Sequence, residues 1–260
     1  MLPAYKMVFL NLILSTLLLL GLIIYRYIFK YKINLFYLLI LISILPIVSI
    51  FRIGTYESGD LSLHTQRLMS FYNLLFNYHL IPRWTPEFNA GYGDPHFLFA
   101  YLLPYFIGSI FHTLGFSFLM SIKLLLAFSF VFSGVAMYFW ANEELGKKAG
   151  FVAAIFYLFT PYHLVDMHFR VTIAENLSFV FLPLVLLSIK KLIENNSKKW
   201  FIVLSISVAL LILSHQAISV MFLPIMASYS IFIWLRKNNK TIKDFCSCLI
   251  SIIFGFLISS

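Results

Sequence analysis

Long apolar runs, broken at intervals by short polar stretches, dominate the chain. Several runs reach or approach the roughly 20 apolar residues that cross a bilayer core as a helix. The pattern predicts an all-α, polytopic transmembrane helical bundle of about eight spans. These lie near 8–28, 34–51, 118–141, 150–164, 176–190, 200–214, 217–235 and 245–260. The last run reaches Ser260 without a polar flank, so we expect this single transmembrane domain, residues 1–260, to be truncated at its C-terminus.

The composition supports a membrane protein. Hydrophobic residues make up 61% of the 260 residues and charged residues only 11%, whereas soluble domains are about 45–50% apolar. The net charge of +9 could indicate nucleic acid, but in a membrane protein it reports basic loops on one side, so we expect no nucleic-acid partner. Cys246 and Cys248 form an isolated C-x-C pair, which favours packing over a metal site.

The basic residues predict the topology. Cytoplasmic loops of membrane proteins carry an excess of Lys and Arg. Thirteen of the 19 basic residues form clusters, namely Arg26/Lys30/Lys32, Lys147/Lys148, Lys190/Lys191, Lys198/Lys199 and Arg236/Lys237/Lys240/Lys243. All these loops can be cytoplasmic only if the further apolar run 97–116 does not cross. That run contains Pro104 and Gly108 and fits an interfacial or re-entrant helix. Residues 52–117 then form one long external loop carrying amphipathic or re-entrant helices.

The external loops predicted in this way carry most of the acids. They hold six of the ten, namely Glu57, Asp60, Glu87, Asp94, Asp166 and Glu175. In "GDLSLHTQR", Asp60, His64 and Arg67 share one face if the stretch is helical. Asp60 is either a functional carboxylate or only a helix cap, a role open also to Ser58, paired with Arg67. A cap needs no histidine one turn later, which favours function.

Two further stretches carry candidate residues. Trp84 lies in a loop rich in proline and glycine; it is either a platform for a sugar ring or part of an interfacial aromatic belt. Arg170 and Glu175 flank the outer mouth of a span, where Arg170 pairs with Glu175 or Asp166, or contacts a substrate. His215 ends the 200–214 span, a position more typical of an interface residue than of a ligand.

The order of these blocks resembles the integral membrane glycosyltransferases of the GT-C type. The blocks are "GDLSLH", then "IPRWTPEFNAGYGDPHFLFAYLLPYFIG", then the stretch from "SGVAMYFW" to "PYHLVDMHFRVTIAENLSFVFLPLVLL". Within that group the chain is most similar to the membrane proteins called 6-pyruvoyl-tetrahydropterin synthase-related or YfhO-like. The resemblance covers about residues 55 to 225, and family members are usually longer.

The resemblance implies transfer of a sugar from a polyprenyl-phosphate donor to a glycan, lipid or protein acceptor on the extracytoplasmic face of the cell membrane. It places the family's two acidic sites on Asp60 and on Glu175, with Asp166 as the weaker candidate for the second. In an inverting displacement Asp60 would be the base and His64 its neighbour. Arg170 would contact the lipid phosphate, and Arg67, Trp84 and His215 would line the substrate site.

The sequence leaves three alternatives open, which concern a metal ion, a transport function and an inactive relative. A divalent cation, Mg²⁺ or Mn²⁺, bridging Asp60, His64 and Glu175 is compatible with the sequence but not required by it. A flippase or transporter for lipid-linked sugars would place ionisable groups deep within the spans, whereas the mid-span positions here are almost wholly apolar. A catalytically inactive relative that serves as an assembly partner is the third reading.

Overall fold

A computed structural model describes residues 4–77 and 81–260, and this part of the chain is helical, with no strand. The apolar runs form α1 (Ala4–Ile23) with η1 (Ile24–Ile28), α2 (Leu35–Ile47) with η2 (Val48–Phe51), α6 (Phe118–Leu145), α7 (Lys147–Leu158), α9 (Ile173–Asn195), α10 (Lys198–Ser214), α11 (Gln216–Arg236) and α12 (Ile242–Ser259). The other stretches hold α3 (Leu61–Asn77), η3 (Asn89–Gly91), α4 (His96–Phe99), α5 (Leu102–Thr113), α8 (Pro161–Val165) and η4 (Asp166–Arg170).

The number of spans differs from the prediction. In the described residues five helices are long and apolar enough to cross a membrane, and a sixth appears if the bent pair α7 and α8–η4 is one broken span. The predicted run 150–164 bends by 47° at this break, because Pro161 disfavours helical conformation in the residue before it. The predicted runs 34–51 and 200–214 form apolar helices of only 17 residues each. About eight spans are therefore not confirmed.

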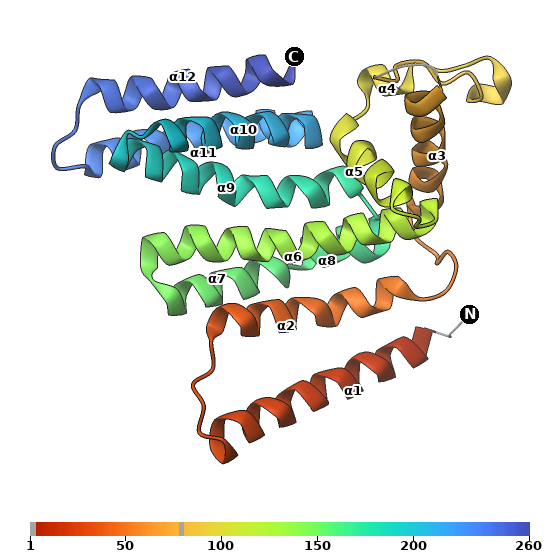
Figure 1. The fold of residues 1–260 in the computed structure, drawn as a ribbon, viewed down its shortest axis with the longest axis horizontal. Helices are drawn as coiled ribbons and strands as arrows, with labels where there is room; N and C mark the ends of the chain where they lie inside the picture. The colour runs from red at the N-terminus through yellow and green to blue at the C-terminus, as the bar shows by residue number, and fades with distance from the viewer. Residues whose placement is uncertain (1–3, 78–80) are drawn as a thin grey trace.

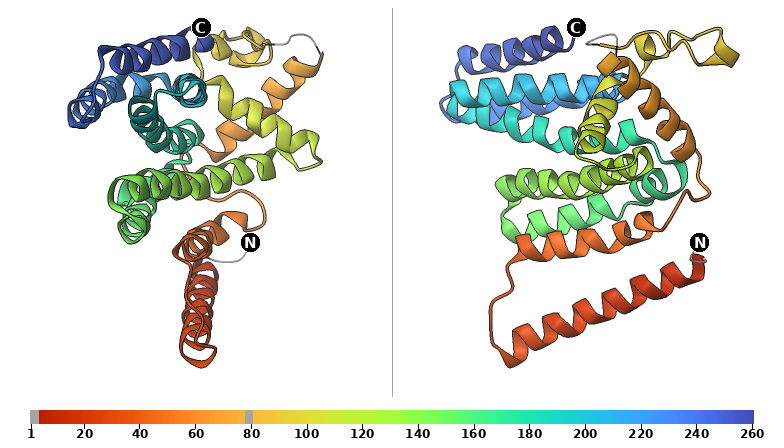
Figure 2. Two further views of the ribbon diagram at one scale, coloured as in Figure 1. Left: turned by 60° about the vertical axis from the view of Figure 1, so that its left-hand side comes forward. Right: turned by 45° about the vertical axis from the view of Figure 1, so that its right-hand side comes forward.

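The long helices lie side by side, with α9 between α6 and the group formed by α10, α11 and α12 (Figure 1). α9 packs against α6, α10, α11 and α12, and 67% of its most apolar stretch of 18 residues is buried. α12 approaches α10 closely at Gly255, where a Cβ would lie 2.6 Å from the Val208 side chain. Small residues at such crossings are typical of helix packing in membranes. α1 differs from the other long helices: only 6% of its most apolar stretch of 18 residues is buried, and it projects from the bundle (Figure 2).

The two ends of the bundle differ (Figure 1). One end, called here the loop end, carries α3, α4 and α5, the turn from η4 to α9 and the turn from α10 to α11. The opposite end, called the basic end, carries the turns α1–α2, α6–α7, α9–α10 and α11–α12 with the clusters of Lys and Arg. α5 has 12 residues, too few for the roughly 20 that a span requires.

Candidate functional site

The turn from η4 to α9 places three of the predicted site residues at the loop end. Asp166 and Arg170 are the first and last residues of η4, and Glu175 lies in the first turn of α9. Between them Val171 is buried in the left-handed conformation, with φ 59° and ψ 48°. A β-branched residue rarely adopts this conformation, and such strain is found mainly where the surrounding structure imposes it, often at functional sites.

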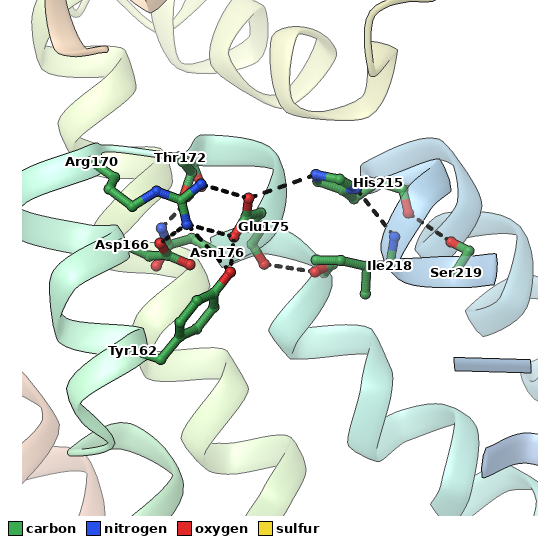
Figure 3. A network of polar contacts seen from close by, with 10 residues as sticks. Tyr162, Asp166, Arg170, Thr172, Glu175, Asn176, His215, Ile218 and Ser219 are labelled. Carbon is green, nitrogen blue, oxygen red and sulfur yellow. Dashed lines mark hydrogen bonds and ion pairs between the residues drawn. The ribbon is translucent and has the colours of Figure 1, made fainter. Parts of the chain in front are cut away.

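Arg170 joins the two carboxylates of this turn (Figure 3). Its Nη1 lies 2.6 Å from Asp166 Oδ1, and its Nη2 lies 3.1 Å from Glu175 Oε1. Both ion pairs considered from the sequence therefore form together. The Tyr162 hydroxyl adds a hydrogen bond of 2.7 Å to Glu175 Oε2. Since two carboxylates surround one guanidinium, the positive charge of Arg170 is already balanced within the protein.

Asp166 is the most buried acid of the cluster. It is 0% exposed, and its Oδ2 has no hydrogen-bond partner among the described residues. A buried polar atom without a partner is costly, and it calls for a partner such as water or a ligand. The Glu175 side chain is 14% exposed and so is reachable from solvent.

His215 closes the cluster on the side of α10 and α11. Its Nδ1 accepts the Ile218 backbone N–H at 3.3 Å and caps α11, and its Nε2 lies 3.9 Å from Glu175 Oε1. Burial lowers the pKa of His215, an effect that the Glu175 carboxylate opposes. The ring stacks on Tyr101 with centroids 4.3 Å apart. His215 thereby connects Glu175 with the segment that leads into α5.

The loop that contains Asp60 is attached to the same turn through its backbone. The Gly59 N–H donates to the Phe169 carbonyl at 2.7 Å, and the Asp60 N–H donates to the Arg170 carbonyl at 3.0 Å. A Cβ on Gly59 would lie 3.0 Å from the Arg170 oxygen, so the close approach favours glycine here. The two external loops predicted to carry the acids are thus held together.

The Asp60 side chain plays neither of the two structural roles considered from the sequence. The His64 N–H bonds to the Asp60 backbone carbonyl at 2.8 Å, and the Ser58 hydroxyl donates to the Tyr56 carbonyl at 3.3 Å. Within the described ranges, neither Asp60 nor Ser58 caps α3 with its side chain, and Asp60 makes no ion pair with Arg67. Its half-buried carboxylate is therefore available to a substrate.

His64 and Arg67 line a cavity of about 300 Å³ beside this loop. The buried His64 shares a 3.0 Å hydrogen bond between its Nδ1 and the Tyr105 hydroxyl. Burial lowers the pKa of His64 to about 3, and the nearby Arg67 and His96 add to this effect, so its imidazole is neutral. Burial also raises the pKa of Tyr105 to about 12. Arg67 has no carboxylate within 4.0 Å in the described part of the chain, so no direct ion pair fixes its guanidinium.

Trp84 lies apart from these groups. A Cβ on Gly93 would lie 2.4 Å from its ring, so the indole rests directly on this glycine. The side chain is 53% exposed and lines neither the 300 Å³ cavity nor the cluster of Arg170. Its contribution is to the shape of the loop.

The proposed metal ligands do not fit a metal site. Across residues 4–77 and 81–260, no three His, Cys, Asp or Glu side chains come together in a group that could hold an ion. Asp60, His64 and Glu175 are therefore not arranged as ligands, and His64 Nδ1 is engaged by Tyr105.

Sequence reasoning missed several residues around the site. Tyr101 stacks on His215, Tyr105 bonds to His64, and Tyr162 bonds to Glu175. In a chain with 15 tyrosines and 29 phenylalanines, aromatic rings near the interface carry no distinguishing signal. His96 was also missed; it lines the cavity and lies close enough to influence the pKa of His64, a proximity that no local spacing in the sequence indicates.

Comparison with known proteins gives a family but no activity. The family described as "6-pyruvoyl-tetrahydropterin synthase related domain; membrane protein" matches residues 99–260. An uncharacterized protein of Lactococcus lactis subsp. cremoris is 24% identical over 216 residues, which cover 81% of this chain and 35% of the relative. The chain thus spans about a third of that relative's length. No solved structure matches.

Proposed function

Because this chain belongs to the 6-pyruvoyl-tetrahydropterin synthase related family of membrane proteins, we propose a reaction performed at a bilayer. In it, a sugar passes from a polyprenyl-phosphate donor to a glycan, lipid or protein acceptor on the extracytoplasmic face of the cell membrane. One observation carries the proposal: the loop of Asp60 is bonded to the turn of Arg170 and Glu175, so two acid-bearing loops from distant parts of the chain form one site.

The chemistry assigns a role to each carboxylate. The Asp60 carboxylate, which has no side-chain partner in the described residues, accepts the proton of the acceptor hydroxyl as the hydroxyl oxygen bonds to the anomeric carbon. The bond from that carbon to the phosphate oxygen breaks, and the polyprenyl phosphate leaves. Glu175, fixed by Arg170 and Tyr162, forms the facing wall of the site and orients the sugar through its hydroxyls.

The leaving phosphate needs positive charge. Arg170 is paired with Asp166 and Glu175, whereas Arg67 makes no ion pair within the described residues and lines the 300 Å³ cavity. We therefore move the phosphate-binding role from Arg170 to Arg67. Arg170 becomes the residue that positions the two acids, and His64 and His215 provide neutral imidazoles at either side.

A transporter of lipid-linked sugars is the second candidate, but the placement of charges disfavours it. Transport sites lie near the bilayer midplane. In the described helices the charged groups gather at the two ends, and the buried Lys123 lies one turn into α6 with its Nζ 2.7 Å from the carbonyls of Arg52 and Gly54. An inactive relative that serves in assembly has no need of an unpartnered Asp60.

The test uses the full-length protein in membranes with a panel of radiolabelled polyprenyl-phosphate sugars. We expect Asp60→Asn and Glu175→Gln each to lower sugar transfer by about 10²–10⁴-fold, the usual contribution of acid–base catalysis. Glu57→Gln is the matched control, because Glu57 is an exposed acid three residues before Asp60 and should keep activity within about twofold.

Expression and the unfolding midpoint are measured for every variant, so that loss of folding is separated from loss of chemistry. Activity retained in well-folded Asp60→Asn would remove Asp60 from the reaction. Absence of transfer by the wild type on every donor would contradict the glycosyltransferase and favour the transporter or the inactive relative.

A further inference from the structure

We propose that a second, larger cleft of the loop end binds the sugar residues of a neutral glycan, as the acceptor half of the site. This inference rests on the proposed function and adds the chemical class of the acceptor. The cleft has a volume of about 750 Å³, within the range of ligand pockets. Its wall comes from α3 and from the loop that precedes α4. The residues that carry the argument are Gln66, Arg67, Glu87, Phe88, Asn89 and Asp94.

The wall of the cleft is held in shape by contacts within the loop. Thr85 and Asp94 form an antiparallel bridge, with N–H to carbonyl distances of 2.8 and 3.1 Å. The buried Ser70 hydroxyl of α3 donates to the Glu87 carboxylate, which anchors the loop to the helix. Asn89 and Ala90 adopt left-handed conformations with φ 54° and 55°. Alanine pays for this conformation with strain, so the surrounding contacts must impose the turn.

The charges of the lining disfavour an anionic ligand in the cleft, whereas the adjoining 300 Å³ cavity, where Arg67 would meet the donor phosphate, lacks Glu87. Glu87 and Asp94 contribute two negative charges and Arg67 one positive charge. Burial and Arg67 lower the pKa of His96, which keeps this imidazole neutral. The cleft is therefore negative by about one charge, and a phosphorylated or acidic sugar would be repelled.

The same lining suits a neutral sugar. Carboxylates accept hydrogen bonds from hydroxyl groups, and the amides of Gln66 and Asn89 can both donate and accept them. The Phe88 ring offers an apolar face for the C–H side of a sugar ring. A hydroxyl-rich, uncharged ligand is the class that uses all of these groups at once.

The cleft leads towards the reaction site. Arg67, Asp94 and His96 line both this cleft and the 300 Å³ cavity, so the two spaces adjoin. His96 Nε2 is buried without a hydrogen-bond partner among the described residues and is free for a ligand. Tyr101 lines the cavity and stacks on His215, whose Nε2 faces Glu175. A glycan lying in the cleft would thus point its end at the carboxylates.

The experiment measures binding by calorimetry with the full-length protein in lipid nanodiscs. The probes are maltotetraose, cellotetraose and chitotetraose as neutral glycans, and tetragalacturonic acid as the anionic counterpart. We expect at least one neutral probe to bind, and the double variant Gln66→Ala, Asn89→Ala to weaken its binding at least tenfold. Asn73→Ala is the matched control, since Asn73 is an exposed amide of α3 outside the cleft, and its affinity should stay within twofold.

Each outcome decides the inference. Binding of none of the neutral probes, stronger binding of the anionic probe, or an undisturbed affinity in the double variant would overturn it. Failure of the proposed reaction is recognised separately, because binding in the cleft does not depend on Asp60. We expect Asp60→Asn to bind the neutral probe like the wild type, whether or not the protein transfers sugar. A wild type that binds the probe in the cleft but transfers no sugar would keep the glycan site and remove the glycosyltransferase.

Discussion

The two ends of the helical bundle handle their buried charges in opposite ways. At the basic end Glu144 accepts three partners, namely the Tyr229 hydroxyl at 2.5 Å, Lys190 Nζ at 3.1 Å and Arg236 Nη2 at 3.0 Å. Lys237 bonds there to Asp244 at 2.8 Å and to the Ile193 carbonyl at 2.8 Å. Each of these five charges has a counterpart, and the network ties α6, α9, α11 and α12 together.

The loop end leaves comparable groups incomplete. In the described residues the Asp60 carboxylate and the Arg67 guanidinium have no ion pair, and Asp166 Oδ2 and His96 Nε2 are buried without partners. An unsatisfied buried polar group costs about 1–3 kcal/mol. The fold provides partners for the charged groups at the basic end but leaves polar groups without partners at the loop end. We infer that a ligand supplies the missing partners there. Both ends carry charged groups. The structural cluster around Glu144 differs from the functional groups of the loop end in that its charged groups all have partners.

The largest effect that tests this comparison is expected at the basic end. Glu144→Gln removes the nearer carboxylate of Lys190, whose side chain is 6% exposed, and of Arg236, and leaves both only Glu194 at 3.8 and 3.9 Å. Breaking a buried ion pair costs about 3–5 kcal/mol, and we expect about 3 kcal/mol because Arg236 can turn to solvent. The free energy of unfolding in lipid or detergent measures this loss.

Asp60→Asn is the counterpart of Glu144→Gln at the loop end, as both exchange one carboxylate for its amide. Its unfolding free energy should change by no more than about 0.5 kcal/mol, since no partner is lost. Folded Glu144→Gln protein should in turn retain its sugar transfer. A stability loss in Asp60→Asn as large as that of Glu144→Gln would contradict the division between the two ends.

A smaller effect is expected from the pH dependence of stability at the loop end. The pKa of His64 is about 3 in the folded protein, below the ordinary value of about 6.5 in the unfolded chain. The unfolded state then binds the proton first, so stability is complete above pH 6.5 and is lost as the pH falls towards 3. The loss between pH 6.5 and pH 5 is about 2 kcal/mol.

His64→Gln is the variant for this measurement, because an amide can still bond to the Tyr105 hydroxyl but does not titrate in this range. The unfolding midpoints of both proteins are followed from pH 7.5 to pH 5. We expect the wild type to lose stability more steeply than His64→Gln. Parallel curves would show that His64 is not buried as a neutral imidazole.

Much of the architecture could be predicted from the sequence, because a bilayer permits few solutions. Backbone groups in lipid must be satisfied within the chain, so long apolar runs form helices. Every predicted span coincides with a helix or a helix pair. The spacing of Arg170 from Asp166 and Glu175 predicted local ion pairs in the same way, since such contacts depend only on residues four or five positions apart.

The remaining features depend on contacts between distant residues. The role of Asp60 is one example. Its backbone N–H donates to the carbonyl of Arg170, a residue distant in the sequence, and no local pattern around Asp60 indicates this contact. The stacking of Tyr101 on His215 joins residues more than a hundred positions apart and has no local pattern. The count of about eight spans is not confirmed, because the pair α7 and α8–η4 bends by 47° and the helices over 35–51 and 198–214 have only 17 residues each.

The smallest predicted effect separates the two arginines of the loop end. Within the described residues Arg67 lines the cavity without an ion pair, so Arg67→Lys should raise the KM for the polyprenyl-phosphate donor about tenfold, because a lysine cannot hold a phosphate bidentately. Its unfolding midpoint should stay unchanged. Tenfold in affinity corresponds to about 1.4 kcal/mol.

Arg170→Lys should show the opposite pattern, with kcat and the unfolding midpoint affected and the donor KM little changed. Its guanidinium bonds to Asp166 and Glu175 at once, and a single ammonium group cannot keep both contacts in the same geometry. We expect a lower kcat and a lower unfolding midpoint with little change in the donor KM, since the loss displaces the two carboxylates rather than the phosphate. Kinetics at varied donor concentration resolve the two patterns. A raised KM in Arg170→Lys together with an unaffected Arg67→Lys would return the phosphate to Arg170, and the saturated pairing of that residue would then have to open when the donor binds.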